Sequence, residues 1–288
     1  MSFLWNVLIL INIYALLCLG NNLTVGYAGL LNLAVAASFA IGSYATALIM
    51  TRLGLGFGPA VAGAVLVSVA MALIIGLATL RYRRTSFALA SLAFQVLVLA
   101  VIRNTALFGG TLGVKAIPRP EWIGAGANAL PWFWLLTAAF LAVVVVAYLG
   151  IRRSPWALAL QASRDDELAA LAIGKNVPWI RIESFLLSSV IIALAGGLFA
   201  SYMQYIDPTS FTVDESIVLL LALVCGGTCN TRGPLLGAVF VIALPEWLRF
   251  LDMSAAYAAN VRNIAFGVAV ILLMRYRPQG LAGRYALD

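Results

Sequence analysis

Apolar residues dominate this chain, and they come in long runs rather than in the short alternating runs of a half-buried sheet. Runs at or above the ~18 residues that a membrane helix needs recur from end to end. The runs predict spans at Phe3–Gly20, about Gly26–Met50, Pro59–Leu80, Ser86–Ile102, Pro131–Leu149, Glu183–Tyr205 and Ala258–Met274. Ser216–Val224 is too short to cross alone, and Leu235–Leu244 continues after a glycine-rich loop. We expect about eight to ten membrane helices, some of them broken or re-entrant.

Composition supports this interpretation. Hydrophobic residues make up 63% of the 288 residues and charged residues 10%, and the mean hydropathy is +1.01. A soluble domain carries about 25% charged residues, and a β-barrel would alternate in segments of about ten residues. The expected fold is therefore all-α, one polytopic membrane domain over residues 1–288. The net charge of +7 is better explained by positive loops on the cytoplasmic side than by nucleic acid.

Polar sequence is concentrated in one stretch, Ser154–Arg181, which we call the island. It carries Arg164, Asp165, Asp166, Glu167, Lys175 and Arg181 among alanines at near-helical spacing. Ser154-Pro155 is typical of a helix start, the three acids suit the first turn of a second helix, and Gly174 suits its C-terminal cap. We therefore expect two short helices outside the hydrocarbon, within a segment of residues 152–181.

Positive charge predicts which loops share a side. The side that we assign to the cytoplasm carries twice as many lysines and arginines as the other. The cytoplasmic set is Arg81, Arg83, Arg84, Arg152, Arg153, Arg164, Lys175, Arg181, Arg232, Arg275, Arg277 and Arg284, and the opposite set is Arg52, Arg103, Lys115, Arg119, Arg249 and Arg262. The island and the tail are thus expected in the cytoplasm. We expect Asp207–Glu215 to form a loop on the other side.

Several activities are disfavoured by what the chain lacks. It has no histidine, which removes the commonest metal ligand and general base, and neither lysine lies in a P-loop motif. Cys225 and Cys229 have no partner ligands in sequence, so we expect no metal site. Glu183 and Glu246 lie near segment ends, where pairing with Arg181 and Arg249 is a simpler role than a proton relay. We expect a protein that is not an enzyme and that borrows any ATPase from a partner.

Two glycine-interrupted segments remain, one in each half of the chain. The first includes Gly26, Tyr27, Gly29 and Asn32, and the second runs from Gly226 and Gly227 to Pro234. Broken helices in corresponding halves are typical of a binding site at the membrane midplane. Close packing of helices through small residues explains the glycines equally well.

Five stretches resemble one family in its own order. They are GYAGLLNLAVAASFAIGSY (26–44), TLRYRRTSFALASLAFQVL (79–97), RDDELAALAIGKNV (164–177), GGTCNTRGPLLGA (226–238) and RPQGLAG (277–283). Together they resemble the M-type permease subunit of the ATP-binding-cassette importers for branched-chain amino acids. The chain departs from the family at Ala34-Val35, where Gly-His is common.

The resemblance implies a permease half that pairs with an H-type permease in the bacterial inner membrane. It implies two cytoplasmic ATPase subunits, which hold ATP and magnesium, and an external substrate-binding protein. The residues implied in ATPase coupling are Asp165, Asp166, Glu167, Ala169, Ala170 and Gly174. The pathway candidates are Gly26, Tyr27, Gly29, Asn32, Gly226 and Gly227. Urea or short amides stay open as substrates, and a secondary transporter or channel stays open as a different class of protein.

Overall fold

The computed structural model describes residues 2–79, 84–120, 123–124, 129–249, 267–268, 270–271, 275–276 and 280–282. Its long helices are α1 (Ser2–Asn22), α2 (Val35–Arg52), α3 (Phe57–Thr79), α4 (Arg84–Asn104), α5 (Ala129–Arg152), α8 (Val177–Met203), α9 (Val213–Gly226) and α10 (Arg232–Arg249). The short elements are the π-helix η1 (Leu23–Tyr27), the 3₁₀ turns η2 (Ala106–Phe108), η3 (Gly110–Leu112) and η5 (Pro208–Phe211), the strands β1 (Val114–Lys115) and β2 (Tyr205–Ile206), and the helices α6 (Pro155–Asp165) and α7 (Glu167–Ala172).

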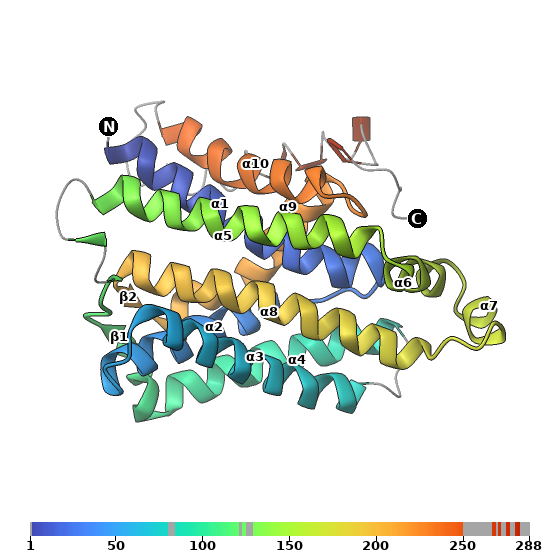
Figure 1. The fold of residues 1–288 in the computed structure, drawn as a ribbon, viewed down its shortest axis with the longest axis horizontal. Helices are drawn as coiled ribbons and strands as arrows, with labels where there is room; N and C mark the ends of the chain where they lie inside the picture. The colour runs from blue at the N-terminus through green and yellow to red at the C-terminus, as the bar shows by residue number, and fades with distance from the viewer. Residues whose placement is uncertain are drawn as a thin grey trace.

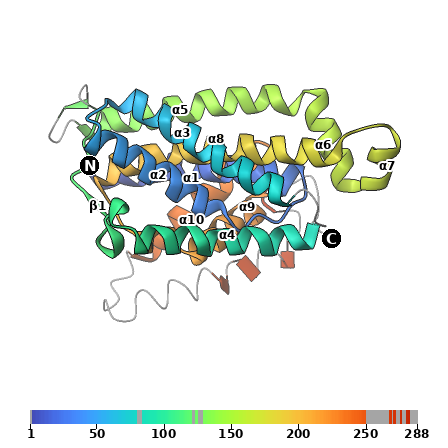
Figure 2. The same cartoon turned by 90° about the horizontal axis from the view of Figure 1, so that it is seen from below.

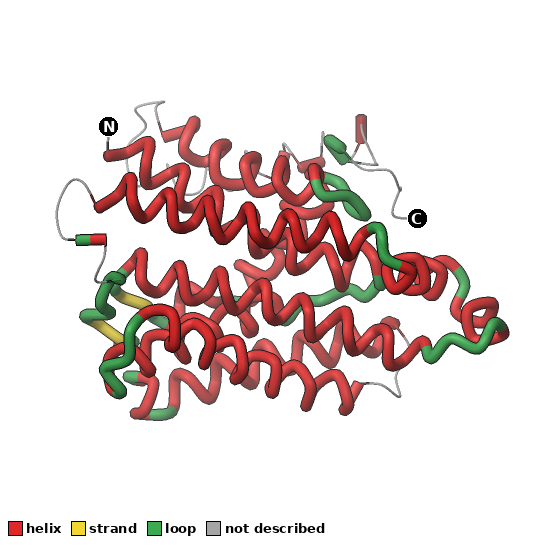
Figure 3. Tube along the Cα trace, viewed as in Figure 1, coloured by secondary structure: helices red, strands yellow, loops and turns green. Residues whose placement is uncertain are grey.

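The long helices run side by side along one axis (Figure 1). Helices α6 and α7 project beyond the bundle at one end, which we call the island end. The far end carries β1 and β2, the short two-stranded ladder drawn in yellow in Figure 3. Within the part of the chain that the structure describes, five helices are long and apolar enough to cross a membrane, so the all-α polytopic fold predicted from the sequence is confirmed.

Helix α8 forms the centre of the bundle, since 72% of its most apolar window is buried. It packs closely on α2 through glycines. A Cβ on Gly42 would lie 2.6 Å from Ala193 Cα, and one on Gly196 would lie 2.7 Å from Phe39 O. Ser43 Oγ donates across this contact to Gly196 O at 3.0 Å. In a membrane the hydrophobic effect does not drive helices together, so close packing must stabilise the bundle. Small residues allow this packing because they let two backbones approach closely.

Most predicted spans match helices to within a few residues, with three exceptions. The second span was predicted from about Gly26, but α2 begins nine residues later, at Val35. Helix α8 begins six residues before the predicted Glu183, because Asn176 caps it through Trp179 N at 3.3 Å and Pro178 lies in its first turn. The predicted last span, Ala258–Met274, and the loop residues Arg81 and Arg83 fall wholly or mostly outside the described residues.

The expectation of an external loop at Asp207–Glu215 is wrong. β2 pairs antiparallel with β1, η5 follows, and α9 already begins at Val213, so Asp214 and Glu215 lie in its first helical turn. Acidic side chains are favoured there by the helix dipole. The chain therefore enters the bundle sooner than its charges indicated.

The island forms two helices, as predicted. Ser154 Oγ accepts from Ala157 N at 3.3 Å and starts α6, and Asp166 Oδ1 accepts from Leu168 N and Ala169 N and starts α7. Gly174 follows α7 with φ +76°, the left-handed conformation that closes a helix. Asp165, however, is the last residue of α6 rather than part of the second helix.

Candidate functional site

Two helices begin deep inside the bundle and meet there, at what we call the mid-depth junction. Helix α9 has 14 residues, about 20 Å of helix, and it runs from this point to the island end. Helix α2 starts at Val35, after the irregular stretch 28–34, and runs to the far end. Ser216 Oγ accepts from Ala36 N at 3.0 Å and joins the two starts. Helix N-termini at mid-depth carry partial positive charge.

Polar side chains at the mid-depth junction are buried and only partly satisfied. Asn32 Oδ1 accepts from Ala34 N at 3.0 Å, and Gln95 Nε2 on α4 donates to Phe211 O at 2.7 Å. Asn32 Nδ2 and Gln95 Oε1 have no hydrogen-bond partner among the described residues, although both side chains are fully buried. Ser91 Oγ, on the same face of α4 as Gln95, accepts from Leu33 N at 3.1 Å. Unsatisfied buried polar atoms are rare and costly, and this cluster leaves one free donor and one free acceptor close to the starts of two helices.

The surface beside the mid-depth junction exposes apolar side chains of the described residues. Leu31, next to the buried Asn32, is 45% exposed, and Leu89 and Val96 on the outer side of α4 are 68% and 54% exposed. Figure 2 shows α4 along one edge of the bundle. The described residues thus present an apolar edge next to buried polar atoms.

An acidic side chain also lies at mid-depth, and the sequence analysis missed it. Tyr14 OH donates to Glu215 Oε1 at 2.6 Å. Tyr14 is 13 residues before the end of η1 at Tyr27, about 20 Å along the helix. The sequence feature that could have predicted a helix start here is Thr212, a residue type common at helix N-caps, followed by two acids and an apolar run.

The other two interruptions meet at the island end, at what we call the end junction. The π-helix η1 continues α1, and the loop 227–231 connects α9 to α10. Arg164 Nη1, from α6, donates to Gly26 O at 2.5 Å and to Cys229 Sγ at 2.7 Å. Burial raises the pKa of the Cys229 thiol, although Arg164 acts to lower it. The thiol is therefore neutral near pH 7 and donates to Gly26 O at 2.9 Å.

Asn22 completes the end junction. Its Nδ2 donates to Tyr148 OH at 2.5 Å and to Asn230 O at 2.9 Å, and its Oδ1 accepts from Cys229 N at 3.2 Å. Asn230 Oδ1 in turn accepts from Gly233 N at 2.5 Å. Cys229 has φ +61°, a conformation uncommon outside glycine, so these hydrogen bonds hold the loop in a defined shape.

The structure separates the predicted pathway residues. Asn32 lies at the mid-depth junction, whereas the other five lie at or beside the end junction: Gly26, Tyr27, Gly29, Gly226 and Gly227. The rings of Tyr27 and Tyr148 pack edge to face with centroids 5.9 Å apart. Gly227, with φ +103°, follows the last residue of α9. The second interruption at mid-depth is thus Asp207–Thr212 rather than the glycine loop.

The predicted coupling residues lie on α6 and α7, at the outer end of the bundle. Asp165, Asp166, Ala169 and Gly174 are exposed, and Ala170 is buried against the bundle. Glu167 pairs with Arg181 of α8 at 2.9 Å. The exposed surface is apolar as well as charged, since Leu168 and Ile173 are 78% and 70% exposed. Large apolar side chains that are exposed outside the bundle are typical of a surface that a partner covers.

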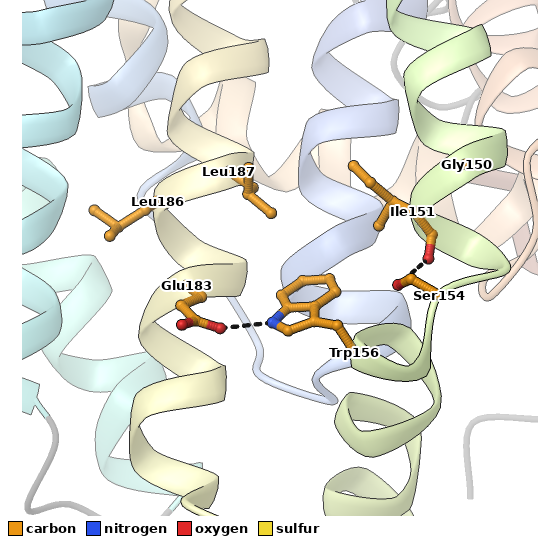
Figure 4. A pocket seen from close by; sticks show the side chains of 7 residues that line it. All are labelled: Gly150, Ile151, Ser154, Trp156, Glu183, Leu186 and Leu187. Atoms are coloured by element: carbon orange, nitrogen blue, oxygen red, sulfur yellow. Dashed lines mark hydrogen bonds between the residues drawn. The ribbon is translucent and has the colours of Figure 1, made fainter.

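Glu183 does not pair with Arg181, contrary to the expectation. Figure 4 shows its carboxylate accepting from Trp156 Nε1, at 2.7 Å, across a groove between α8 and the start of α6. The groove has a volume of about 570 Å³ and is otherwise lined by Gly150, Ile151, Ser154, Leu186 and Leu187. Glu246 is half-buried in α10, and the side chain of Arg249, its expected partner, lies outside the described residues.

The described basic residues divide between the two ends as the sequence predicted. Arg152, Arg164 and Arg232 lie at the island end, and Arg52 and Arg103 lie at the far end. A family model described as branched-chain amino acid transport system / permease component matches residues 3–274. The chain belongs to this permease family.

Relatives within the family cover almost the whole chain. The high-affinity branched-chain amino acid transport system permease protein LivM of Salmonella typhimurium is 31% identical, over 93% of this chain and 67% of its own length. A probable branched-chain amino acid transport permease protein LivM of Methanocaldococcus jannaschii is 24% identical, over 96% of this chain and 92% of its own length.

The fold is also similar to that of a solved structure, PsaBC from Streptococcus pneumoniae in complex with Fab. The TM-score is 0.50 and the identity 15%, over 95% of this chain and 91% of the other. The chain is thus a multi-pass membrane permease component, and its fold is shared with a protein of very different sequence.

Proposed function

We propose that this permease is one half of the membrane pore of an ATP-driven importer for branched-chain amino acids, in a bacterial inner membrane. A second, H-type permease would cover its open edge along α4. Two ATPase subunits, carrying ATP and magnesium, would bind the island on the cytoplasmic side, and an external binding protein would deliver the solute at the far end.

The observation that carries this proposal is the shape of the island. Helices α6 and α7 project from the bundle as ordered, capped helices rather than as a loop (Figure 1). Their surface combines exposed acids, Asp165 and Asp166, with exposed Leu168 and Ile173. A rigid helix with an uncovered apolar side chain can transmit force from a bound partner to the bundle. Movement of the bundle as rigid bodies would then open the pore alternately to either side.

The mid-depth junction is the proposed contact with the solute. The start of α2 and the amide donor of Asn32 suit the carboxylate of an amino acid, and the acceptor Gln95 Oε1 suits its ammonium. A branched side chain would lie against the apolar edge formed by Leu31 and α4. Urea or a short amide would use the same donor and acceptor without needing the apolar surface.

A second class of function is favoured by one observation, the carboxylate of Glu215 at mid-depth beside Tyr14. Acidic groups at that depth are typical of proton- or sodium-coupled transporters. Such a transporter would move solute without an ATPase, and this separates it from the importer.

The test of the importer reverses charge on the island. We expect Asp166→Arg with Glu167→Arg to abolish co-purification of the ATPases and ATP-dependent leucine uptake. Asp166→Asn with Glu167→Gln is the matched control, because asparagine still caps α7 and glutamine can still accept a hydrogen bond from Arg181. Unchanged ATPase binding and uptake in the double reversal would show that the island is not the coupling element.

A further inference from the structure

Arg164 is placed to connect the island to both junctions. We propose that it is the positioning residue through which movement of the island reaches the mid-depth junction. This inference rests on the proposed function, because it assumes that ATPases move the island. Arg164 is not among the residues that the sequence implied in coupling.

The contacts of Arg164 reach three elements. It is the penultimate residue of α6, and its Nη1 contacts Gly26 O at the end of α1–η1 and Cys229 Sγ in the α9–α10 loop. Its aliphatic stem fills the space beside Gly29, where a Cβ would lie 2.6 Å from Arg164 Cγ. One side chain from the island therefore touches both interrupted helices.

The chemistry of these contacts favours arginine. Gly26 O lies at the C-terminal end of a long helix, where unpaired carbonyls and the dipole favour a cation. Both contacts come from one nitrogen, Nη1, so a lysine ammonium could donate to the same two acceptors. The guanidinium is rigid and planar, whereas the ammonium is a flexible point charge, so lysine would hold the contacts less firmly.

Movement of α7 can reach Arg164 because α7 joins the end of α6 directly, while Glu167 of α7 also pairs with Arg181 of α8. Ala157, Leu160 and Ser163 of α6 are buried against the bundle. Between the two helices, Asp166 is extended, with φ −144° and ψ +108°. A pull on α7 therefore acts at the end of α6, one residue away from Arg164.

The stretch that follows Gly29 leads to the mid-depth junction. Residues 29–34 have no helical or strand hydrogen bonding, and Val35 begins α2. Only two residues separate Gly29 from Asn32, and consecutive Cα atoms keep a fixed spacing, so a displacement of Gly29 shifts Asn32 and the start of α2. Because Ala36 N donates a hydrogen bond to Ser216 Oγ, the same displacement would also move Ser216 and α9. A contiguous set of contacts thus runs from the island to the candidate solute site.

The test compares solute transported per ATP hydrolysed by the reconstituted complex of both permeases, both ATPases and binding protein. We expect Arg164→Gln to bind ATPases within twofold of wild type but to lower leucine transported per ATP about tenfold, the size expected for lost charged hydrogen bonds. Arg164→Lys should be intermediate. Arg153→Gln, at an exposed arginine of the same region, is the matched control and should behave as wild type.

Cys229 gives a second measurement on the same contact. With Cys18→Ala and Cys225→Ala, Cys229 is the chain's only remaining thiol. Because Cys229 is buried, we expect slow labelling by N-ethylmaleimide that changes when ATP is added. In the Arg164→Gln variant, labelling should be faster and indifferent to ATP. This readout does not depend on uptake.

A variant cycle separates coupling from a merely structural role. Cys229→Ala leaves Arg164 bound to Gly26 O and should lower transport per ATP about threefold, with no further loss when added to Arg164→Gln. Wild-type transport per ATP in Arg164→Gln, or independent effects of the two changes, would overturn the inference. Failure of the wild-type chain to bind ATPases would instead overturn the proposed function.

Discussion

The end junction and the mid-depth junction are built from similar parts, yet their asparagines are paired differently. At the end junction, Asn22 uses both side-chain ends, on Tyr148, Asn230 and Cys229, although the hydroxyls of Thr228 and Thr231 in the same loop have no hydrogen-bond partner among the described residues. At the mid-depth junction, Asn32 and Gln95 each use one end and leave the other without a partner among the described residues. Both sets of side chains are buried, so exposure does not explain the difference.

The difference indicates two roles. A buried polar network that is fully connected rigidifies a structure, whereas unpaired buried groups cost free energy and persist where function requires them. We therefore propose that Asn22 makes the end junction a connector, and that the mid-depth junction retains polar atoms for a solute. Substitutions should therefore affect stability at the first and transport at the second.

The largest effect is expected for Asn22→Ala. The change removes the three hydrogen bonds that Asn22 makes with Tyr148 OH, Asn230 O and Cys229 N, all of them buried. The free energy of unfolding should therefore fall by about 3 kcal/mol. The midpoint of thermal unfolding in detergent measures it. Asn12→Ala is the control, since Asn12 Nδ2 makes one half-buried hydrogen bond, to Thr137 Oγ1. Equal losses in the two variants would contradict the connector role.

A smaller effect, of a different kind, is expected for Asn32→Thr. Threonine keeps an oxygen that can accept from Ala34 N but lacks the amide donor that the solute would use. Leucine uptake should fall about tenfold while the free energy of unfolding changes by less than about 1 kcal/mol. Asn104→Thr, at the exposed end of α4, is the control. A large loss of stability with normal uptake would give the mid-depth junction a structural role only.

The smallest effect is expected for Glu183→Gln, outside both junctions. Glutamine still accepts from Trp156 Nε1, so unfolding should change by less than about 0.5 kcal/mol and uptake by less than about twofold. Thermal unfolding and liposome uptake measure the two quantities. A tenfold loss of uptake would mean that the groove of Figure 4, and not the mid-depth junction, contacts the solute.

Local features of this fold could be predicted from sequence. Long apolar runs fix the spans, and Ser154-Pro155 and Gly174 fix the ends of the island helices, because caps depend on neighbouring residues alone. The start of α9 after Thr212 could also have been predicted from neighbouring residues, but Asp214 and Glu215 were assigned to a loop because they are charged. The expected pair of Arg181 and Glu183 also failed for a local reason, because residues two apart on a helix do not face each other.

The junctions could not be predicted, because their contacts join distant residues. Gly26 and Cys229 are 203 positions apart, and Asn22 and Tyr148 are 126 apart. The glycines marked both interruptions but not which of them would meet. Only the packed helices show that Gly26 lies beside the α9–α10 loop and that Asn32 lies deeper in the bundle.

The most direct test of the central claim is leucine flux into liposomes that contain either this chain alone or the complete set of two permeases, two ATPases and binding protein. The account predicts uptake by the complete set only, dependent on ATP and lost when the ATPases are omitted. Uptake by the chain alone without ATP, sensitive to Glu215→Gln, would contradict it and indicate an ion-coupled transporter.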